Sequence, residues 1–524
     1  MKRWTHLALI VAGLGLVLAV LAWLRPLALP DEGRYGDVGR FMMRSGDWLA
    51  PRLDGIPFFH KPPLLHWLQA ATLSVAGVHP WVSRWVPMGH ALLMLGVMAW
   101  ATRRCLGEAV AWRATLLLGT SLGFLIGGQY INHDMLVAAW ISVALWCFAL
   151  SLLHGDKPCP SLARVGFIAC GLGVLAKGLI GLVLPGLVLV VWITLTRQWR
   201  KVLHLPWFTG LAGLALITLP WFIWVERVHP GVFDYLIVGQ HFGRYTGTTF
   251  NNPWPWWFYW VVLCGLLFPG TLIAYGSGLS RVFTAPRSLL TPVPPERALL
   301  WVWVITITVF FSLPRSKLVG YILPVLPPLA VIAADAWQRR WGHRSWSSGL
   351  FIALCAINLG LAVGANQVAG QYSLRKSSVD VAQRLACDMQ AGDTVWVAGA
   401  YPYDLPYWAD LRAPVVVLSD WDQARKTAGD NWQRELFEGE AFDPPAAQRW
   451  LRPIEELQAT RTREDWLVVP RGFDASQLEQ WALVQEGRAW SLWRGKGSAG
   501  ESPVPTQHKG LRCGDEHRQP QGQQ

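Results

Sequence analysis

The feature that most constrains this chain is a succession of apolar segments, most of them long enough to cross a lipid bilayer as helices. A transmembrane helix needs about 20 predominantly apolar residues. Such segments lie at residues 7–24, 86–101, 110–128, 135–153, 162–178, 179–196, 204–225, 256–277, 299–313, 318–336 and 346–366. They predict a polytopic all-α membrane protein with about eleven spans. The first segment ends in bulky Trp23-Leu24 rather than in a small-residue cleavage site, so we expect it to be retained.

The composition agrees with a membrane protein. Hydrophobic residues make up 52% of the 524 residues and charged residues 15%. A soluble globular protein carries roughly 25% charged residues. An ordinary soluble enzyme is therefore excluded, as is a largely disordered chain.

The net charge of +12 has three candidate explanations: a nucleic-acid partner, anionic lipid, or membrane topology. If the N-terminus lies in the cytoplasm, the basic residues gather in the cytoplasmic loops, as the positive-inside rule requires. Those residues are Lys2, Arg3, Arg103, Arg104, Arg113, Lys157, Arg164, Arg197, Arg200, Lys201, Arg281, Arg287, Arg297, Arg339, Arg340 and Arg344. We therefore expect a cytoplasmic N-terminus, an external C-terminal region and no nucleic-acid partner.

The composition changes after the last apolar segment. We expect residues 1–370 to form the membrane domain, with a first external loop at 26–85, and residues 372–495 to form a small external α/β domain. Short apolar runs at 394–397, 414–418, 466–469 and 482–493 predict its strands. Residues 496–524 are rich in Gly, Ser, Pro and Gln and predict a disordered tail.

The first external loop contains most of the residues suited to chemistry. Asp31, Glu32 and Arg34 follow the first span directly, at the membrane–water boundary. An acidic pair there could act on a substrate, or it could only cap a helix and favour its dipole. Lys61 precedes Pro62-Pro63, which stiffens the backbone beside a cation suited to a lipid phosphate; the alternative is a lysine that snorkels to headgroups.

Four short sequence motifs follow one another in this loop. They are Asp-Glu-x-Arg-Tyr at 31–35, Ser-Gly-Asp-Trp at 45–48, Pro-Arg-Leu-x-Gly at 51–55 and Phe-x-Lys-Pro-Pro at 59–63. Their order resembles the multi-span GT-C glycosyltransferases, which include the protein O-mannosyltransferases and the bacterial transferases that add aminoarabinose to lipid A. The resemblance covers about residues 25–370 and implies a GT-C fold with about 11–13 transmembrane helices. It also implies a bacterial inner-membrane protein with a periplasmic C-terminal domain.

The resemblance implies roles for individual residues. Asp31 matches the catalytic carboxylate of the family, and Glu32 and Asp134 are further acidic candidates. Arg34 and Lys61 match positions that face the phosphate of a polyprenyl-phosphate sugar, where positive charge stabilises the leaving group. The full set of donor-phosphate candidates is Arg34, Tyr35, Lys61, Lys177, Arg244, Lys317 and Tyr321. Lys317 and Tyr321, four residues apart, are expected on one face of a starting helix.

One residue departs from the family pattern. The relatives that modify lipid A usually have Glu where this chain has His60. His60 and His241 could share a divalent metal ion, but two histidines without a third ligand make a poor site. We therefore expect no obligatory metal or other cofactor.

The leading hypothesis is an integral-membrane glycosyltransferase. It would move a sugar from a polyprenyl-phosphate donor to an external lipid A-like lipid, glycan or protein, with inversion at the anomeric carbon, among membrane lipids. The alternative is a flippase or transporter for a polyprenyl or other anionic lipid. A transporter is expected to have two halves with matching broken spans, and no such repeat is seen. A phosphatase or acyltransferase would need a nucleophile or His-Asp pair that the sequence does not supply.

Overall fold

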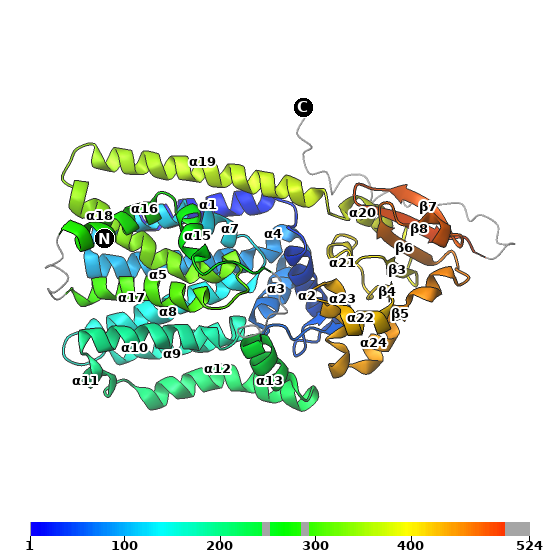
Figure 1. Ribbon diagram of the computed structural model, residues 1–524, viewed down its shortest axis with the longest axis horizontal. Coiled ribbons are helices and arrows are strands. Elements are labelled where there is room, and N and C mark those ends of the chain that lie inside the picture. Colours follow the sequence, from blue (N-terminus) through cyan, green and yellow to red (C-terminus); the bar gives the residue numbers. More distant parts are fainter. Residues whose placement is uncertain (1, 244–251, 285–292, 498–524) are drawn as a thin grey trace. The chain divides into compact units, whose positions relative to one another are not determined.

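The computed structural model describes residues 2–243, 252–284 and 293–497 (Figure 1). By their contacts, the residues divide into two compact units. The helical unit comprises Met1–Pro26, Val38–Pro51 and Phe58–Gln371. The sheet unit comprises Leu27–Asp37, Arg52–Pro57 and Tyr372–Gln524, so two pieces of the first external loop belong to it. Arg244 and the predicted tail from 498 onward lie outside the described residues, as does the side chain of His241.

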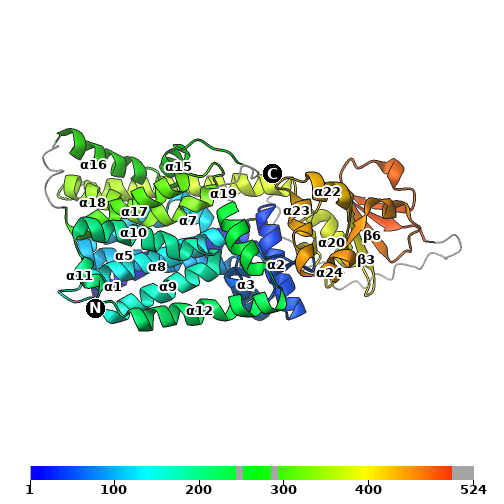
Figure 2. The ribbon, with the colours of Figure 1, turned by 60° about the horizontal axis from the view of Figure 1, so that its bottom comes forward.

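The helical unit is built from helices that run side by side (Figures 1 and 2). Among the described residues, eight helices are long and apolar enough to cross a membrane by length and composition. They are Thr5–Leu24, Pro80–Leu106, His133–Leu153, Pro160–Lys177, Trp207–Val228, Pro295–Ser312, Val319–Trp341 and Ser347–Leu374. The prediction of a polytopic, mainly helical membrane fold is confirmed.

In element order, the helices of this unit are α1 (Lys2–Leu24), α3 (Leu64–Ala76), α4 (Pro80–Ser83), α5 (Trp85–Leu106), α6 (Glu108–Gly119), α7 (Leu122–Gly127), α8 (His133–Leu153), α9 (Pro160–Lys177), α10 (Ile180–Thr196), α11 (Trp199–Val202), α12 (Trp207–Val228), α13 (Val232–Asp234), η1 (Tyr235–Gly243), α15 (Phe258–Leu266), α16 (Gly270–Thr284), α17 (Pro295–Ser312), η3 (Val319–Val325), α18 (Leu326–Trp341) and α19 (Ser347–Leu374). Helix α2 (Asp31–Ser45) starts in the sheet unit and ends in the helical unit.

Two predicted spans are broken into pairs of shorter helices. The apolar segment 110–128 forms α6 and α7, because Ser121 caps a new helix by accepting a hydrogen bond from the backbone N–H of Phe124. The segment 256–277 forms α15 and α16, which Pro269 separates, since proline cannot donate the next helical hydrogen bond. The segment 179–196 forms the 17-residue helix α10. The length criterion therefore counts fewer spans than the apolar segments suggested.

Helix α8 forms the core of the helical unit. Of its most apolar window, 89% is buried, and α8 packs against α5 and α9. Small residues allow close approach of its neighbours; a Cβ added at Gly166 of α9 would clash with the ring of Phe148. By contrast, only 22% of the corresponding window of α19 is buried. A helix that is apolar all round and still exposed fits a lipid environment.

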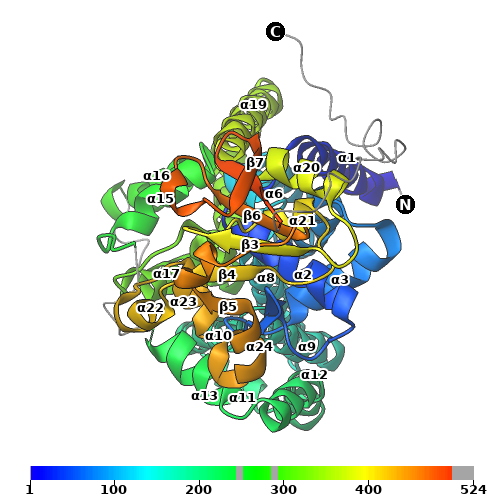
Figure 3. The same ribbon diagram turned by 90° about the vertical axis from the view of Figure 1, so that its right-hand side faces the viewer.

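The sheet unit is centred on a six-stranded sheet with the order β5-β4-β3-β6-β8-β7. Strands β3 to β6 are parallel, and β8 adds antiparallel to β6 and β7. Figure 3 views these strands together with their covering helices. The strands are β3 (Thr394–Ala398), β4 (Val416–Ser419), β5 (Leu451–Pro453), β6 (Asp465–Pro470), β7 (Trp481–Glu486) and β8 (Trp490–Gly495). The helices are α20 (Val379–Asp388), α21 (Leu405–Trp408), α22 (Trp421–Thr427), α23 (Trp432–Phe437), α24 (Pro444–Trp450), η4 (Glu440–Phe442), η5 (Ile454–Gln458) and η6 (Ala475–Gln477).

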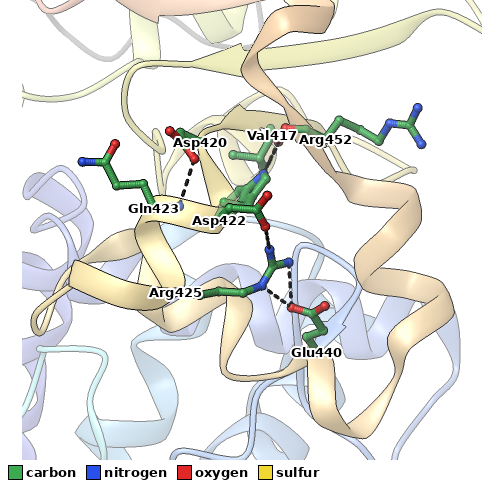
Figure 4. Close-up of polar contacts among 8 residues, drawn as sticks. Val417, Asp420, Asp422, Gln423, Arg425, Glu440 and Arg452 are labelled. Carbon is green, nitrogen blue, oxygen red and sulfur yellow. Dashed lines mark hydrogen bonds and ion pairs between the residues drawn. The ribbon is translucent and has the colours of Figure 1, made fainter.

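Each apolar run predicted as a strand in this region overlaps one, and 482–493 overlaps both strands of the β7–β8 hairpin. Strand β5 was not predicted, because Leu451-Arg452-Pro453 has no apolar run. Polar side-chain contacts stabilise both ends of helix α22 (Figure 4). Asp420 accepts from the backbone N–H of Gln423 at 2.9 Å, and Arg425 bridges Asp422 and Glu440.

A hairpin from the first external loop also belongs to the sheet unit. Strands β1 (Arg52–Leu53) and β2 (Ile56–Pro57) are joined by Asp54 and Gly55. Both turn residues have positive φ, at 52° and 72°, as a two-residue hairpin turn requires. The Asp54 carboxylate accepts a hydrogen bond from the backbone N–H of Val415 at 2.8 Å. The Pro-Arg-Leu-x-Gly motif thus forms a turn that anchors the loop to this unit.

Candidate active site

In the helical unit, three predicted site residues meet. Asp134 lies in the first turn of α8, and Lys177 is the last residue of α9. The Lys177 ammonium donates a hydrogen bond to Asp134 Oδ1, and the two side chains are only 8% and 10% exposed. Lys177 Nζ also lies 4.3 Å from the centre of the Tyr321 ring, a cation–π contact. The structure therefore brings Asp134, Lys177 and Tyr321 together.

The backbone around this pair leaves room for it. Gly178 follows Lys177 with φ of 85°, which ends α9 directly after the lysine. Gly320 of η3 faces the Asp134 carboxylate so closely that a Cβ there would overlap it. Asn132 caps α8, accepting from the Asp134 N–H at 3.2 Å. Two helix ends and one glycine thus place an ion pair in the interior of the unit.

Lys317 is bound to backbone rather than set on a helix. Its Nζ donates to the carbonyl oxygen of Trp254 at 2.9 Å and to that of Pro314. The expectation that Lys317 and Tyr321 share a helical face is wrong, because Leu318 is extended and η3 starts only at Val319. Burial lowers the pKa of Lys317, whose side chain is almost fully enclosed. Lys317 ties two chain segments together.

Lys61 and His60 lie next to the Pro-Pro pair. Lys61 Nζ donates to the carbonyl oxygen of His60 at 2.8 Å, and Lys61 is partly exposed. The His60 ring stacks on Phe58 with centroids 4.3 Å apart. Within the part of the chain that the structure describes, no group of three or more His, Cys, Asp or Glu side chains could hold a metal ion.

The sheet unit holds the other group of predicted residues. Arg34 donates through one terminal nitrogen to Asp31 Oδ1 and through the other to Glu435 Oε1. Tyr403 donates its hydroxyl to the second oxygen of Glu435. Tyr35 completes the group, with its ring centre 4.7 Å from the Arg34 guanidinium carbon. Asp31 is thus the outer member of a chain of charged hydrogen bonds, with 28% of its side chain exposed.

The electrostatics of this group keep Arg34 charged. Burial opposes the charge, but the surrounding tyrosines and the carboxylates of Asp31 and Glu435 outweigh it and raise the pKa of Arg34 well above its ordinary value. Burial, followed by the charge of Glu435, raises the pKa of Tyr403, so its hydroxyl stays a donor. The arrangement holds one cation between two carboxylates.

Glu32 has a different environment from Asp31. It is fully buried, and its carboxylate accepts from the backbone N–H of Ala28 at 2.7 Å. This contact closes the turn before α2, and both Asp31 and Glu32 lie in the first turn of that helix. Of the two acidic residues, Asp31 is the one with a partly exposed side chain.

Sequence reasoning missed Glu435 and Tyr403. Arg34 and Glu435 are separated by 401 residues, and neither Glu435 nor Tyr403 belongs to a recognisable motif. Only information that relates positions far apart in the sequence could have identified Glu435 and Tyr403 as partners of Arg34.

Known proteins resemble this chain over most of its length. Residues 5–235 match the family model described as dolichyl-phosphate-mannose-protein mannosyltransferase. The chain is 29% identical over 440 residues to undecaprenyl phosphate-alpha-4-amino-4-deoxy-L-arabinose arabinosyl transferase 1 of Sodalis glossinidius, covering 81% of this chain and 73% of the relative. It is 30% identical over 379 residues to the enzyme of that name from Pseudomonas aeruginosa UCBPP-PA14, covering 72% and 67%. A third transferase of this name, from Pseudomonas savastanoi, matches this chain over 59% of its own length.

A solved structure shares the fold. ArnT from Cupriavidus metallidurans, crystallised with undecaprenyl phosphate, superimposes with a TM-score of 0.78 at 23% identity, over 95% of this chain and 100% of that chain. Together with the helical membrane fold, the family model and these relatives define an integral-membrane glycosyltransferase of the GT-C type. The chain belongs to the family of bacterial undecaprenyl phosphate-aminoarabinose arabinosyl transferases. It is therefore a multi-pass protein of the bacterial inner membrane, and the motif-based prediction of family and enzyme class is confirmed.

Proposed function

We propose that this enzyme transfers 4-amino-4-deoxy-L-arabinose from undecaprenyl phosphate to a lipid A-type acceptor on the periplasmic side. The single observation that carries the choice of sugar and carrier is the likeness to the arabinosyl transferases over 81% of the chain. The basic residues of the predicted cytoplasmic loops support a cytoplasmic N-terminus and a periplasmic sheet domain.

The proposed reaction is a direct displacement. An acceptor oxygen attacks the anomeric carbon, the bond from that carbon to the phosphate oxygen breaks, and undecaprenyl phosphate leaves with the electron pair. Asp31 accepts the acceptor's proton, for which its partly exposed carboxylate is suited. One displacement inverts the configuration at the anomeric carbon.

The cations support departure of the phosphate. Arg34 and Lys61 supply positive charge where negative charge develops on the leaving group. Lys177 belongs to the same set, with Asp134 as a positioning residue that holds its ammonium against Tyr321. Lys317, bound by two carbonyl oxygens, shapes the loop that precedes Tyr321.

The proposal is tested with Asp31→Asn in the full-length protein, reconstituted with the undecaprenyl-phosphate sugar and lipid A. We expect transfer to fall at least 100-fold, the low end of the contribution of a general base, because the amide cannot take the proton. The mass increment on lipid A is the measurement, and an unchanged thermal midpoint shows that the variant is folded.

Asp47→Asn is the matched control from the same loop. Asp47 accepts from the backbone N–H groups of Leu49 and Ala50, which an asparagine oxygen can also do. Full transfer by Asp31→Asn would remove the catalytic assignment. A mass increment on glycan or protein fractions instead of lipid A would replace the proposed acceptor.

A further inference from the structure

A cavity of about 490 Å³ lies between α16 and α18, and none of the candidate site residues described above lines it. Figures 1 and 2 show the two helices side by side at the end of the helical unit from which α1 starts. The sequence predicts that end to be cytoplasmic. The cavity is lined by Leu272, Ile273, Gly276, Ser277, Ser280, Ala336, Arg339, Arg340 and Trp341.

The lining follows one face of each helix. On α16, the lining residues recur at spacings of three and four, which places them on a single stripe. Leu272 is 51% exposed, so the apolar part of this stripe opens to the surroundings of the bundle. The cavity is therefore apolar along its helical side and basic where α18 ends.

The two arginines of the lining differ in their partners. Arg339 donates to Asp335 at 2.5 Å, and Asp335 also binds Arg297 at 2.9 Å. Asp335 is thus occupied by two cations. Arg340 makes no hydrogen bond or ion pair with any residue that the structure describes, and no acidic residue lines the cavity.

The remaining lining groups also favour an anion. The hydroxyls of Ser277 and Ser280 already donate to helix carbonyls, so Arg340 is the main donor that the lining offers to a ligand. Trp341 packs edge-on against Trp337, with ring centroids 4.8 Å apart. Tryptophan is enriched at the level of lipid headgroups, and this favours phosphate depth for the neighbouring Arg340.

We propose that this cavity binds the phosphate headgroup of an anionic glycerophospholipid, with its acyl chains along α16. A basic cavity between transmembrane helices on the cytoplasmic side has the charge and depth for such a headgroup. The site is separate from the donor and acceptor chemistry and does not rest on the proposed function.

The first test measures lipid binding to the full-length protein in detergent. Phosphatidylglycerol is titrated, and its apparent affinity is taken from the rise in thermal midpoint, with phosphatidylcholine and inorganic phosphate as parallel titrants. We expect a saturable rise with phosphatidylglycerol only. Arg340→Gln should weaken it about fivefold, the effect of one arginine near an anionic headgroup. Arg344→Gln is the matched control, since Arg344 stacks on Trp346 outside the cavity.

The second test fills the cavity without changing charge. A Cβ at Gly276 meets no atom within 4 Å, so Gly276→Leu should fold and occupy the space for the headgroup. Gly186→Leu on α10 is its control, because Gly186 has equally open surroundings. We expect Gly276→Leu to weaken phosphatidylglycerol binding at least as much as Arg340→Gln.

Three results would overturn the proposal. Equal losses in Arg340→Gln and Arg344→Gln would show general surface attraction. Wild-type affinity in Gly276→Leu would show that the lipid does not enter the cavity. An equal response to inorganic phosphate or phosphatidylcholine would remove the anionic lipid as the ligand.

Discussion

Lys177 and Asp134 form an ion pair between the end of α9 and the start of α8, in the interior of the helical unit. An unpaired lysine at such a position would be costly. Asp134 compensates the charge of Lys177 and so removes that cost. In turn, Lys177 is the partner of the buried Asp134 that the sequence did not reveal. The pair can hold the bundle together, or it can hold the lysine for a substrate phosphate, and the two roles are separable by mutation.

Removing one member of this pair should destabilise the protein far more than removing both. Lys177→Met or Asp134→Asn alone leaves a buried partner without its counterpart, which costs about 3–5 kcal/mol. The double variant should recover most of the thermal midpoint. If Lys177 also serves the donor phosphate, the double variant should still bind donor poorly. Additive losses in the thermal midpoint would show that the two side chains are not coupled.

Gly320→Ala should act through Asp134. The added methyl group overlaps the Asp134 carboxylate, so the carboxylate must move away from Lys177. We expect a lower thermal midpoint and reduced transfer. In an Asp134→Ala background, which removes the overlapping carboxylate, the same glycine change should have little further effect. An equal effect in both backgrounds would exclude this mechanism.

Glu435→Gln should reduce transfer without unfolding the sheet unit. The charge-assisted hydrogen bond to Arg34 is weakened, and Arg34 in turn holds Asp31. A hydrogen bond to a charged group contributes about 1.5 kcal/mol or more, which corresponds to about tenfold in rate. Tyr403→Phe, which removes only the hydroxyl donor, should have a smaller effect in the same direction.

The control for this network is Glu440→Gln, since Glu440 pairs with Arg425 on α22, outside the network (Figure 4). It should leave the transfer rate unchanged. If the Glu435→Gln and Glu440→Gln variants transferred the sugar at the same rate, Glu435 would have no positioning role.

Asp54→Asn should stabilise the protein increasingly as the pH rises. Burial raises the pKa of Asp54 well above its ordinary value of 3.8, so the folded state favours the protonated carboxyl. The contribution of this group to stability is full below the ordinary pKa and is lost as the pH rises through the raised one. Asparagine does not titrate and can still accept from Val415. Thermal midpoints of both proteins between roughly pH 4 and pH 8 measure the difference.

Asp474→Asn provides a control of opposite sign. Hydrogen bonds from Ser476 lower the pKa of Asp474, so its contribution is present above the ordinary pKa and lost at lower pH. A difference between wild type and Asp54→Asn that does not change with pH would show that Asp54 is not buried as a neutral acid.

The sequence alone was sufficient for the membrane class and the family. Apolar length is a local property, so the buried helix α8 and the exposed helix α19 were both recognisable without knowing their neighbours. The sequence predicted 110–128 and 256–277 as single spans, and the breaks at Ser121 and Pro269 were seen only in the structure. The motifs of the first external loop were enough to identify the family, because all of them lie within one short segment of the chain.

Tertiary structure decided what each charged residue does. Asp31 and Arg34 are three residues apart and meet on one helix, so their contact follows from helical geometry. The partners Glu435 for Arg34 and Lys177 for Asp134 come from distant segments that only the folded chain brings together. Lys317 binds two carbonyl oxygens because its segment is extended. Sequence therefore determined the class of protein through local length and spacing, whereas the pairing of charges depended on chain folding, because electrostatic contacts are set by distance in space.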